Sequence, residues 1–490
     1  MNIKRRQFLA STTAAAGIAL TSKAHAQKAS TQKSPELRVA VIGVRGRGKS
    51  HINGLANNVV ALCDVDEKIL DDRVKQFEDK TSRKIQRFTD FRKLVESDEI
   101  DAVSIATPNH THCMIAIAAC AAGKDVYCEK PISHNVWEGR QLVNAARKHD
   151  RIVQCGTQSR SSPSLQEAVE FVRGGVLGKI QYAIGTCYKP RQPIGKLDKP
   201  LTIPAHVDYD LWCGPAEKAD LYRPKLHYDW HWDFNTGNGD TGNQGIHQMD
   251  IARWFLGEQT VAPRTLSIGG RVGYEDAGNT PNTQIVLHDY EAAPLIFETR
   301  GLPKSKKAQA SESKWKSSMD SYRGSQIGLI VQCEEGHVVI PAYTSATAYD
   351  ADGKEINTWT EGGNHFANWV QAVKQRDRSL LNAEVLEGHL SSALCHIGNV
   401  SHRLGKPATS DSIQATIGDN KLFGDSFERM ADHLSKNGID IASTPITLGA
   451  DVVLNPETES SEVEEVATML RRKCRTGFEI PDLSPEPIGA

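Results

Sequence analysis

The sequence predicts an α/β protein whose N-terminal domain is a parallel sheet covered by helices on both faces. Residues 37–42 (LRVAVI) form an apolar run typical of a buried strand, and a glycine-rich turn follows this run at once. Similar apolar runs then alternate with helical patterns as far as residue 155, which is the order of a doubly wound fold. A chain of 490 residues is too long for one ordinary core, so we expect a second domain.

Each element of the first domain can be placed from this alternation. The predicted strands cover residues 37–42, 59–63, 102–106, 125–128 and 152–155. A first helix is predicted to begin near Ser50, and four further helices are predicted over residues 66–79, 88–95, 115–122 and 136–149. Parallel strands place the loops that follow them at one edge of the sheet. The loops 43–48, 107–112 and 129–131 and residue Asp64 are therefore expected to meet at one crevice.

The glycine loop 43–48 (GVRGRG) predicts a dinucleotide site at that crevice. Its spacing is GxxGxG and not GxGxxG, and a tight turn that binds nothing is the alternative interpretation. The second strand ends in Asp64, 21 positions after Gly43, which favours the dinucleotide. The Asp64 carboxylate can accept hydrogen bonds from ribose hydroxyls and repels a 2′-phosphate, so NAD is favoured over NADP. Arg45 and Arg47 soften this repulsion.

Composition and charge narrow the range of partners. The formal net charge is −2, which gives no reason to expect nucleic acid or an anionic membrane as a partner. We predict no membrane span, because no apolar run approaches the required length. The ten cysteines are scattered without a CxxC pair. His389, His396 and His402 lack a supporting carboxylate or cysteine pattern, so we predict no metal site and interpret them as packing residues.

Residues 1–26 have the pattern of a twin-arginine export signal. Residues 4–9 (KRRQFL) precede a short apolar stretch, and residues 24–26 (AHA) have the small-x-small form of a cleavage site. Residues 27–36 are expected to be a flexible linker. The twin-arginine machinery carries folded proteins to the periplasm, where free dinucleotide is scarce. We therefore expect this protein to load its cofactor before export and to hold it tightly.

Four motifs in this order give the chain a family resemblance: the glycine loop, TPNHTH at 107–112, CEKP at 128–131 and NQGIHQMD at 243–250. Over residues 37–405 the chain resembles the Gfo/Idh/MocA oxidoreductases, and its signal makes it similar to the exported branch with a C-terminal extension, here 406–490. The resemblance implies a Rossmann domain over 37–155. It also implies an α/β substrate and oligomerisation domain over 156–405, with a large, mostly antiparallel open sheet through which a homo-oligomer forms.

The resemblance also implies the residues of a site. The lysine of the EKP motif is Lys130, and the histidine of the family's D-x-G-x-H motif is His247. Asn243 stands where aspartate is common, and an amide cannot take a proton as a carboxylate does, so the role of general base shifts toward His247. The predicted catalytic residues are Lys130, His247 and Asn243.

The predicted ligand contacts come from the converging loops and from the start of the second domain. The cofactor contacts are Gly43, Gly46, Arg47, Gly48, Asp64, Thr107, Asn109, His112, Glu129, Lys130 and Gln158. The substrate contacts are Arg160, Tyr188, Tyr228, Trp230, Asn243 and His247, with Lys189 and Arg191 as weaker candidates. Residues 227–233 (HYDWHWD) suggest a carbohydrate wall, and a half-buried strand is the alternative.

Three functions are compatible with these residues. The first is an NAD-dependent oxidoreductase acting on a hydroxyl of a sugar, glycoside or polyol. The second is glycoside cleavage by transient oxidation at C3 and elimination, which regenerates the bound NAD. The third is a carbohydrate-binding protein that NAD only stabilises. Outside the site, we interpret residues 302–322 as a solvated insertion, with a flap at the substrate edge as the alternative, and we expect residues 410–490 to wrap the surface or a neighbouring subunit.

Overall fold

The computed structural model describes residues 37–484, and its first domain is built on a parallel sheet of six strands in the order β3-β2-β1-β4-β5-β6. This order and the parallel pairing throughout are those of a doubly wound dinucleotide-binding sheet, which confirms the first part of the predicted fold class. The strands are β1 Val39–Ile42, β2 Val59–Cys63, β3 Gln86–Phe88, β4 Ala102–Ile105, β5 Asp125–Cys128 and β6 Val153–Cys155.

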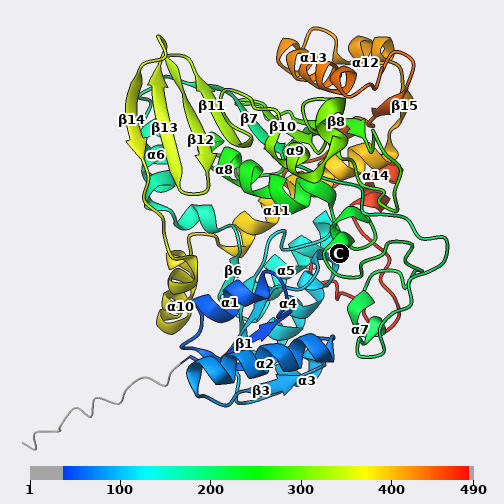
Figure 1. Ribbon diagram of the computed structural model, residues 1–490. Helices are drawn as coiled ribbons and strands as arrows, with labels where there is room; N and C mark the ends of the chain where they lie inside the picture. The colour runs from blue at the N-terminus through cyan, green and yellow to red at the C-terminus, as the bar shows by residue number, and fades with distance from the viewer. Residues whose placement is uncertain (1–36, 485–490) are drawn as a thin grey trace, which may run out of the picture. The chain divides into compact units, whose positions relative to one another are not determined.

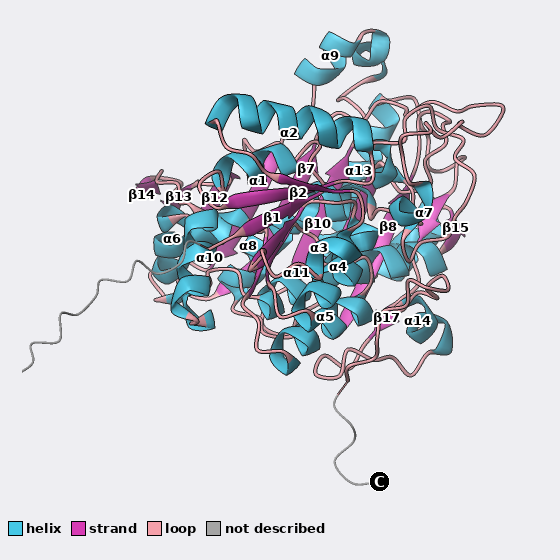
Figure 2. Cartoon of the chain, turned by 90° about the horizontal axis from the view of Figure 1, so that it is seen from below, coloured by secondary structure: helices cyan, strands magenta, loops and turns pink. Residues whose placement is uncertain are grey.

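Helices pack on both faces of this sheet, with α2 on one side of β1 and β2 and α4 and α5 on the other (Figure 2). They are α1 Gly48–Gly54, α2 Glu67–Thr81, α3 Phe91–Val95, α4 His112–Ala121 and α5 Val136–Lys148. The helix predicted over 88–95 is wrong at its start, because Phe88 ends strand β3. Helix α3 begins only after Asp90, because the Asp90 side chain accepts a hydrogen bond from the Arg92 backbone N–H and caps the helix.

The second domain contains an 11-stranded sheet in the order β14-β13-β12-β11-β7-β10-β9-β8-β16-β15, with β17 also paired to β8. Its pairs are antiparallel except for β7 and β10, so the predicted large, mostly antiparallel sheet is confirmed. The strands are β7 Ile180–Tyr188, β8 Arg264–Gly270, β9 Thr283–His288, β10 Leu295–Arg300, β11 Ile327–Cys333, β12 Gly336–Ala342, β13 Ser345–Asp350, β14 Glu355–Trp359, β15 Lys406–Ala408, β16 Ile446–Leu448 and β17 Val452–Val453.

Strand alternation divides the side chains of this sheet between two cores. Along β7, Ala183 and Cys187 belong to the core shared with helices α6 and α8, whereas Ile184 between them belongs to the core on the opposite face. We call these the inner and the outer face. The remaining helices are α6 Pro163–Arg173, α7 Tyr209–Cys213, α8 Ile246–Leu256, α9 Glu312–Ser317, α10 His365–Gln375, α11 Val385–Leu404, α12 Ser410–Ile417, α13 Lys421–Lys436 and α14 Glu464–Met469.

The outer face of β7–β10 is covered by the chain itself, with α12 and α13 lying over this end of the sheet (Figure 1). Helix α13 places an apolar stripe on the sheet through Phe423, Phe427, Met430 and Leu434, which recur at helical spacing. Each such side chain contributes roughly 1.5–3 kcal/mol when buried. Residues 410–436 therefore form part of the core and do not merely wrap the surface.

The insertion predicted over 302–322 also differs from the expectation of a solvated loop. It carries α9, and its residues Leu302, Trp315 and Met319 are buried in the same outer core. The Trp315 indole N–H donates to the Gly301 carbonyl oxygen over 3.1 Å. None of these residues lines the cavity described below, so the structure does not support a flap there.

The end of the chain returns to the first domain. Phe478 and Ile480 are buried in the core that also holds β4, β5 and α4. Gln141 on α5 accepts a hydrogen bond from the Leu483 backbone N–H over 2.6 Å. Strands β15, β16 and β17 join the large sheet, so residues 406–484 belong structurally to both domains and the boundary expected at residue 405 does not separate a distinct unit.

Candidate functional site

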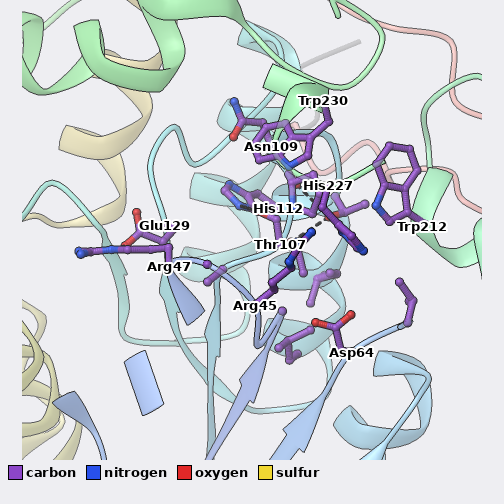
Figure 3. Close-up of a pocket in the computed structure, with 18 of the residues that line it drawn as sticks. Arg45, Arg47, Asp64, Thr107, Asn109, His112, Glu129, Trp212, His227 and Trp230 are labelled. Atoms are coloured by element: carbon purple, nitrogen blue, oxygen red, sulfur yellow. Dashed lines mark hydrogen bonds and ion pairs between the residues drawn. The ribbon is translucent and has the colours of Figure 1, made fainter. Parts of the chain in front are cut away.

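A cavity of about 540 Å³ lies at the carboxyl edge of the parallel sheet. The loops after β1, β2, β4 and β5 line it, which confirms the crevice expected from the strand order. Segments of the second domain complete the wall at 211–212, 227–231 and 242–243. Figure 3 shows Asp64 on one side of this cavity and Arg47 with Glu129 on another.

The glycine loop forms a backbone cradle in which three glycines serve different purposes. Gly43 has a φ of +82°, and a Cβ there would lie 2.7 Å from the Ala106 carbonyl carbon. A Cβ on Gly48 would lie 1.9 Å from the Gly43 carbonyl oxygen, so both positions exclude any larger residue. Gly46 has a φ of +30° and open space within 4 Å of an added Cβ. The loop therefore presents bare backbone at the start of α1, as a pyrophosphate site requires.

Asp64 occupies the end of β2 in the geometry that a ribose site needs. Its Oδ2 accepts a hydrogen bond from the Val44 backbone N–H over 2.9 Å, and its Oδ1 accepts one from the Asp66 backbone N–H over 3.0 Å. These bonds fix the carboxylate on the cavity wall. Burial raises the pKa of Asp64 to about 6, although the two N–H donors oppose this shift.

The lining fits a dinucleotide by its open cradle and by a donor that has no partner. Asn109, on the loop after β4, is 3 % exposed, and its Nδ2 has no hydrogen-bond partner within the part of the chain that the structure describes. A buried amide donor of this kind normally has an acceptor. Asn109 lines the cavity, so a rotation of its covered amide would bring this donor to an acceptor on a bound cofactor.

His112 joins two of the cavity loops. Its Nδ1 lies 2.7 Å from the Pro131 carbonyl oxygen, and its Nε2 lies 2.8 Å from the Thr107 carbonyl oxygen. Burial lowers the pKa of the ring below 6.5. The ring lines the cavity with Thr107, but its polar atoms already serve the protein backbone.

Glu129 is the centre of a buried charged network at the second end of the cavity. Its Oε1 accepts hydrogen bonds from Arg47 Nε over 2.7 Å and from His51 Nε2 over 3.0 Å, and His51 Nδ1 contacts Ser104 Oγ at 2.7 Å. These partners hold the pKa of Glu129 well below its usual range, although burial, the largest single influence, acts in the opposite direction. The network links the glycine loop, α1 and β5 within the first domain.

Lys130 reaches from the first domain to the second. Its Nζ donates to the Asn243 carbonyl oxygen over 2.6 Å, and both residues line the cavity. Burial lowers the pKa of Lys130 below its ordinary 10.5, with the neighbouring Glu129 opposing the shift. Asn243 lies in η4, a π-helical turn over Thr241–Gly245 that leads directly into α8. Such turns are frequent at functional sites because they re-aim the side chains they carry.

His247 follows one turn later and lies behind this wall. It is 5 % exposed, and its Nδ1 has no hydrogen-bond partner in residues 37–484. Burial holds the pKa of His247 well below 6.5, and the charge of Lys130 contributes in the same direction. The ring is therefore neutral at pH 7 and a weaker base than an ordinary histidine. Its centroid lies 4.8 Å from that of Tyr343, whose hydroxyl accepts a hydrogen bond from Gln244 Nε2 over 2.7 Å.

The segment 227–231 supplies aromatic and imidazole groups to the cavity. Tyr228, Trp230 and His231 line it, as expected for two of them, and the rings of Trp230 and His231 stack with centroids 3.6 Å apart. The segment is a short 3-10 turn, η3 over Asp229–Trp232, and not the strand weighed as the alternative. Tyr228 has a φ of +67° and is 55 % exposed.

A roof from the second domain closes the end near Asp64. Asp66 Oδ1 lies 2.9 Å from His206 Nδ1, and Asp66 Oδ2 lies 2.9 Å from His227 Nε2. The His206 carbonyl oxygen accepts a hydrogen bond from the Glu67 backbone N–H over 2.9 Å, so backbone contacts support the side-chain ones. Trp212, on the same inserted segment, lines the cavity (Figure 3). We call residues 201–231 the roof segment.

Besides His247 and Gly48, the predicted contacts Tyr188, Arg160 and Gln158 and the weaker candidates Lys189 and Arg191 are not among the residues that line the cavity. Tyr188 points to the outer face of the sheet, where its hydroxyl donates to Glu298 Oε2 over 2.6 Å. Arg160 is buried, and its Nε donates to Asp250 Oδ1 over 2.9 Å. Gln158 begins a 3-10 turn and is likewise outside the lining. Strand alternation explains the case of Tyr188, since its neighbours on β7 face the inner side.

The sequence reasoning did not identify several residues of the site: Asp66, His206, Trp212, Tyr343 and His51. Among them only His51 carries a usable signal, because it lies one helical turn after Gly48 on the predicted first helix. No group of three or more metal-ligating side chains occurs among the described residues. No helix within residues 37–484 is long and apolar enough to cross a membrane.

The fold and the cavity define a dinucleotide-binding α/β protein of two domains. Family models identify it further: "Oxidoreductase family, NAD-binding Rossmann fold" matches residues 37–157, and "Oxidoreductase family, C-terminal alpha/beta domain" matches residues 179–308. The chain belongs to the Gfo/Idh/MocA oxidoreductase family, whose first domain binds NAD. The export signal lies outside the described residues.

Curated relatives of known activity match part of the chain. It is 28% identical over 180 residues to the levoglucosan dehydrogenase of Pseudarthrobacter phenanthrenivorans, covering 36% of this chain and 39% of the relative. It is 27% identical over 254 residues to the myo-inositol 2-dehydrogenase of Thermotoga maritima, covering 51% of this chain and 64% of the relative. The chain therefore spans less than two thirds of the length of these relatives.

Solved structures share the fold over most of their length. A levoglucosan dehydrogenase in complex with NADH and L-sorbose has a TM-score of 0.55 and 17% identity, covering 74% of this chain and 95% of that one. The WlbA dehydrogenase of Bordetella pertussis, in complex with NADH and UDP-GlcNAcA, has a TM-score of 0.52 and 16% identity, covering 73% of this chain and 94% of that one. At this identity the likeness concerns the fold.

Proposed function

We propose that this protein is an NAD-dependent oxidoreductase acting on a hydroxyl of a sugar, glycoside or polyol. The observation that carries the proposal is the cavity itself: one wall holds Asp64, whose carboxylate can accept hydrogen bonds from ribose hydroxyls, and another holds Lys130 beside Asn243. The sugar and polyol dehydrogenases among its relatives support the substrate class.

The residues at the Lys130 end can hold and deprotonate a hydroxyl. Bound NAD supplies the hydride acceptor for the carbon that carries that hydroxyl. Because its pKa is lowered by burial, Lys130 can accept the hydroxyl proton or stabilise the developing alkoxide. The Asn243 carbonyl oxygen orients the Lys130 amine. His247, the other base expected from the sequence, lies behind this wall, and burial holds its pKa well below 6.5, so it is a weaker base than an ordinary histidine.

Replacement of Lys130 tests this function. We expect Lys130→Ala to reduce the rate of cofactor reduction in a sugar and polyol panel by roughly a thousandfold, with NAD still bound. Absorbance of the reduced cofactor measures the rate, and denaturation followed by chromatography measures the NAD content. Lys68→Ala on the exposed side of α2 is the control. An unchanged rate in Lys130→Ala would remove Lys130 from the chemistry.

The roof segment supports a retained cofactor. His206 and His227 secure it to Asp66, and its residue Trp212 encloses the cavity. We propose that NAD loads before twin-arginine export to the periplasm and stays bound there, so that it must be reoxidised in place. We expect the full chain purified from the periplasmic fraction to contain one NAD per chain. A protein found in the cytoplasm or free of NAD contradicts it.

A retained cofactor also favours a second candidate, the cleavage of a glycoside through transient oxidation. In that cycle the cofactor returns to its starting state within one turnover. Release of free sugar from a glycoside panel without lasting cofactor reduction identifies this reaction. Lasting reduction with formation of a keto product identifies the dehydrogenase.

We propose that self-association, expected through the large sheet, uses the outward face of β12–β14. The outer face of β7–β10 is covered by α9, α12 and α13. The outward side chains of β12 and β13, such as Val339 and Tyr349, are half-buried at most. Light scattering of the protein and of Val339→Lys tests this: a dimer or larger assembly that becomes a monomer in the variant is expected.

A further inference from the structure

His231 lies on the wall of the cavity, whereas His247 lies behind it. It belongs to the turn η3, in the segment between β7 and α8. Its ring stacks on that of Trp230, with centroids 3.6 Å apart, and the side chain is half-buried. A ligand in the cavity can therefore reach His231, although the sequence assigned no role to this residue by itself.

The loop that follows η3 places His231 at the Lys130 end of the cavity. A Cβ on Gly237 would lie 2.6 Å from the His231 Cα, so this loop packs directly against the turn. Further along the same loop, a Cβ on Gly242 would lie 3.4 Å from Pro131 Cγ, and Pro131 is the residue after Lys130. One loop thus contacts both the turn that carries His231 and the segment that carries Lys130.

The hydrogen bond of the His231 ring fixes its tautomer. Nδ1 contacts the Tyr228 carbonyl oxygen, which can only accept a hydrogen bond, so Nδ1 carries the proton. The His231 backbone N–H donates to the same oxygen over 3.2 Å. Tyr228 has a φ of +67° and a ψ of −49°, and such a strained backbone persists only where the surrounding structure holds it. The neutral ring therefore carries its lone pair on Nε2.

The Nε2 atom of His231 is open to a ligand. It makes no hydrogen bond within residues 37–484, and it is not one of the fully covered polar atoms of that range. Burial lowers the pKa of His231 to about 3, and the charge of Lys130 acts in the same direction. At neutral pH the ring is therefore uncharged and offers an acceptor. An acceptor needs a donor from the ligand, which a hydroxyl supplies and a carboxylate does not.

We infer that His231 is a substrate-binding residue: its Nε2 accepts a hydrogen bond from a second hydroxyl of the sugar or polyol, while Lys130 faces the hydroxyl to be oxidised. The inference rests on the proposed function, because it assigns a further residue of that same site. It makes the site selective for compounds with several hydroxyls. An analogue that lacks the second hydroxyl leaves the acceptor unpaired and is rejected for that reason.

Calorimetric titration of the NAD-containing full chain measures this contact. The probes are glucose, galactose, mannose and myo-inositol, and then the monodeoxy derivatives of whichever of the four binds most tightly. We expect at least one deoxy derivative to bind about tenfold more weakly than the unmodified compound. In His231→Asn the unmodified compound should bind about tenfold more weakly, and that deoxy derivative should bind as well as the unmodified compound does.

Two variants separate the contact from the shape of the turn. His231→Asn retains an amide N–H for the Tyr228 carbonyl oxygen but has no acceptor at the position of Nε2. His231→Gln brings an amide oxygen near that position and should recover most of the affinity. His149→Asn, at the end of α5, is the control and should bind as the parent protein does. The NAD content and the urea midpoint of each variant report whether it is folded.

Four results overturn the inference. They are absence of binding by all four compounds, equal binding of every deoxy derivative by the parent protein, undiminished selectivity in His231→Asn, and an equal loss of affinity in folded His231→Asn and His231→Gln. The second of these needs no variant, so the inference can fail even if His231→Asn does not fold.

Cofactor reduction in the same samples keeps this inference distinct from the proposed function. Reduction with an unchanged KM in His231→Asn overturns the role of His231 and leaves the oxidoreductase in place. Binding that depends on His231, without cofactor reduction or product formation, supports the contact and contradicts the oxidoreductase.

Discussion

The two ends of the cavity each hold a buried carboxylate between two basic side chains, but they are assembled from different parts of the chain. Glu129 is bound by Arg47 and His51, all within the first domain. Asp66 is bound by His206 and His227, which belong to a segment inserted in the second domain. The first network is part of the folded Rossmann domain, whereas the second is a contact between the two domains.

This difference assigns separate roles to the two networks. Each network reaches solvent through one basic side chain, since Arg47 is 40% and His206 41% exposed. Only the Glu129 network, however, lies wholly within one folded domain. We therefore expect changes at Glu129 to affect the stability of the fold and changes at His206 to affect cofactor release.

The largest effect is expected for Glu129→Gln, which leaves Arg47 and His51 without their carboxylate. Breaking a buried ion pair of this kind lowers the free energy of unfolding by about 3 kcal/mol. Because the folded pKa of Glu129 is depressed below 4.5, its contribution is present at neutral pH and is lost as the pH falls below about 4.5. Urea unfolding at pH 7 and at pH 4 measures both effects.

Glu96→Gln is the control for that change, since Glu96 is exposed and pairs only with Lys93 at the surface. Its free energy of unfolding should change by less than about 0.5 kcal/mol. If Glu129→Gln is equally mild, the network is not a folding element and the distinction between the two ends fails.

An intermediate effect is expected for the pH dependence of NAD affinity, through the ionisation of Asp64. The ionised carboxylate accepts hydrogen bonds from ribose hydroxyls, and its pKa in the free protein is about 6. NAD binding therefore favours the ionised form, and the affinity should fall by up to about tenfold for each pH unit below 6. Equilibrium dialysis of NAD between pH 8 and pH 4.5 checks this. Asp64→Asn should bind weakly at every pH, and a slope that survives in this variant would assign the titration to another group.

The smallest effect is expected for His206→Ala, which loosens the roof segment without removing a residue from the cavity wall. Loss of one hydrogen bond to Asp66 corresponds to about 1 kcal/mol, so bound NAD should dissociate roughly fivefold faster. Exchange with a fluorescent NAD analogue measures the rate. His149→Ala at the end of α5 should leave the rate unchanged.

The cofactor end was predictable from the sequence because its information is local. Gly43, Gly48 and Asp64 lie within one strand–turn–helix–strand unit, and each is required by backbone geometry that their spacing reveals. Strand β3 escaped prediction because its three residues, QRF, contain no apolar run.

The roof segment and the surroundings of His247 were less predictable, because the residues in contact there are distant from one another in the sequence. Asp66 and His206 are separated by 140 positions, and no local pattern links them. Tyr343 reaches His247 from the turn between β12 and β13, and no local sequence pattern links these two residues. The assignment of Tyr188 to the substrate was wrong for a related reason: alternation shows that neighbouring residues face opposite sides of a sheet but does not show which side holds the site.

The return of the C-terminal residues to the first domain also determines when this domain can complete its core during synthesis. Phe478 and Ile480 complete a core whose strands were made more than 300 positions earlier, as the numbering of Val126 and Val153 shows. At roughly 5–20 residues per second, the ribosome needs tens of seconds to supply these two side chains after the parallel sheet has emerged. During that interval the nascent first domain exposes the apolar surface that they later cover, which makes it a substrate for chaperones, and a chain that stops short of residue 478 keeps that surface exposed.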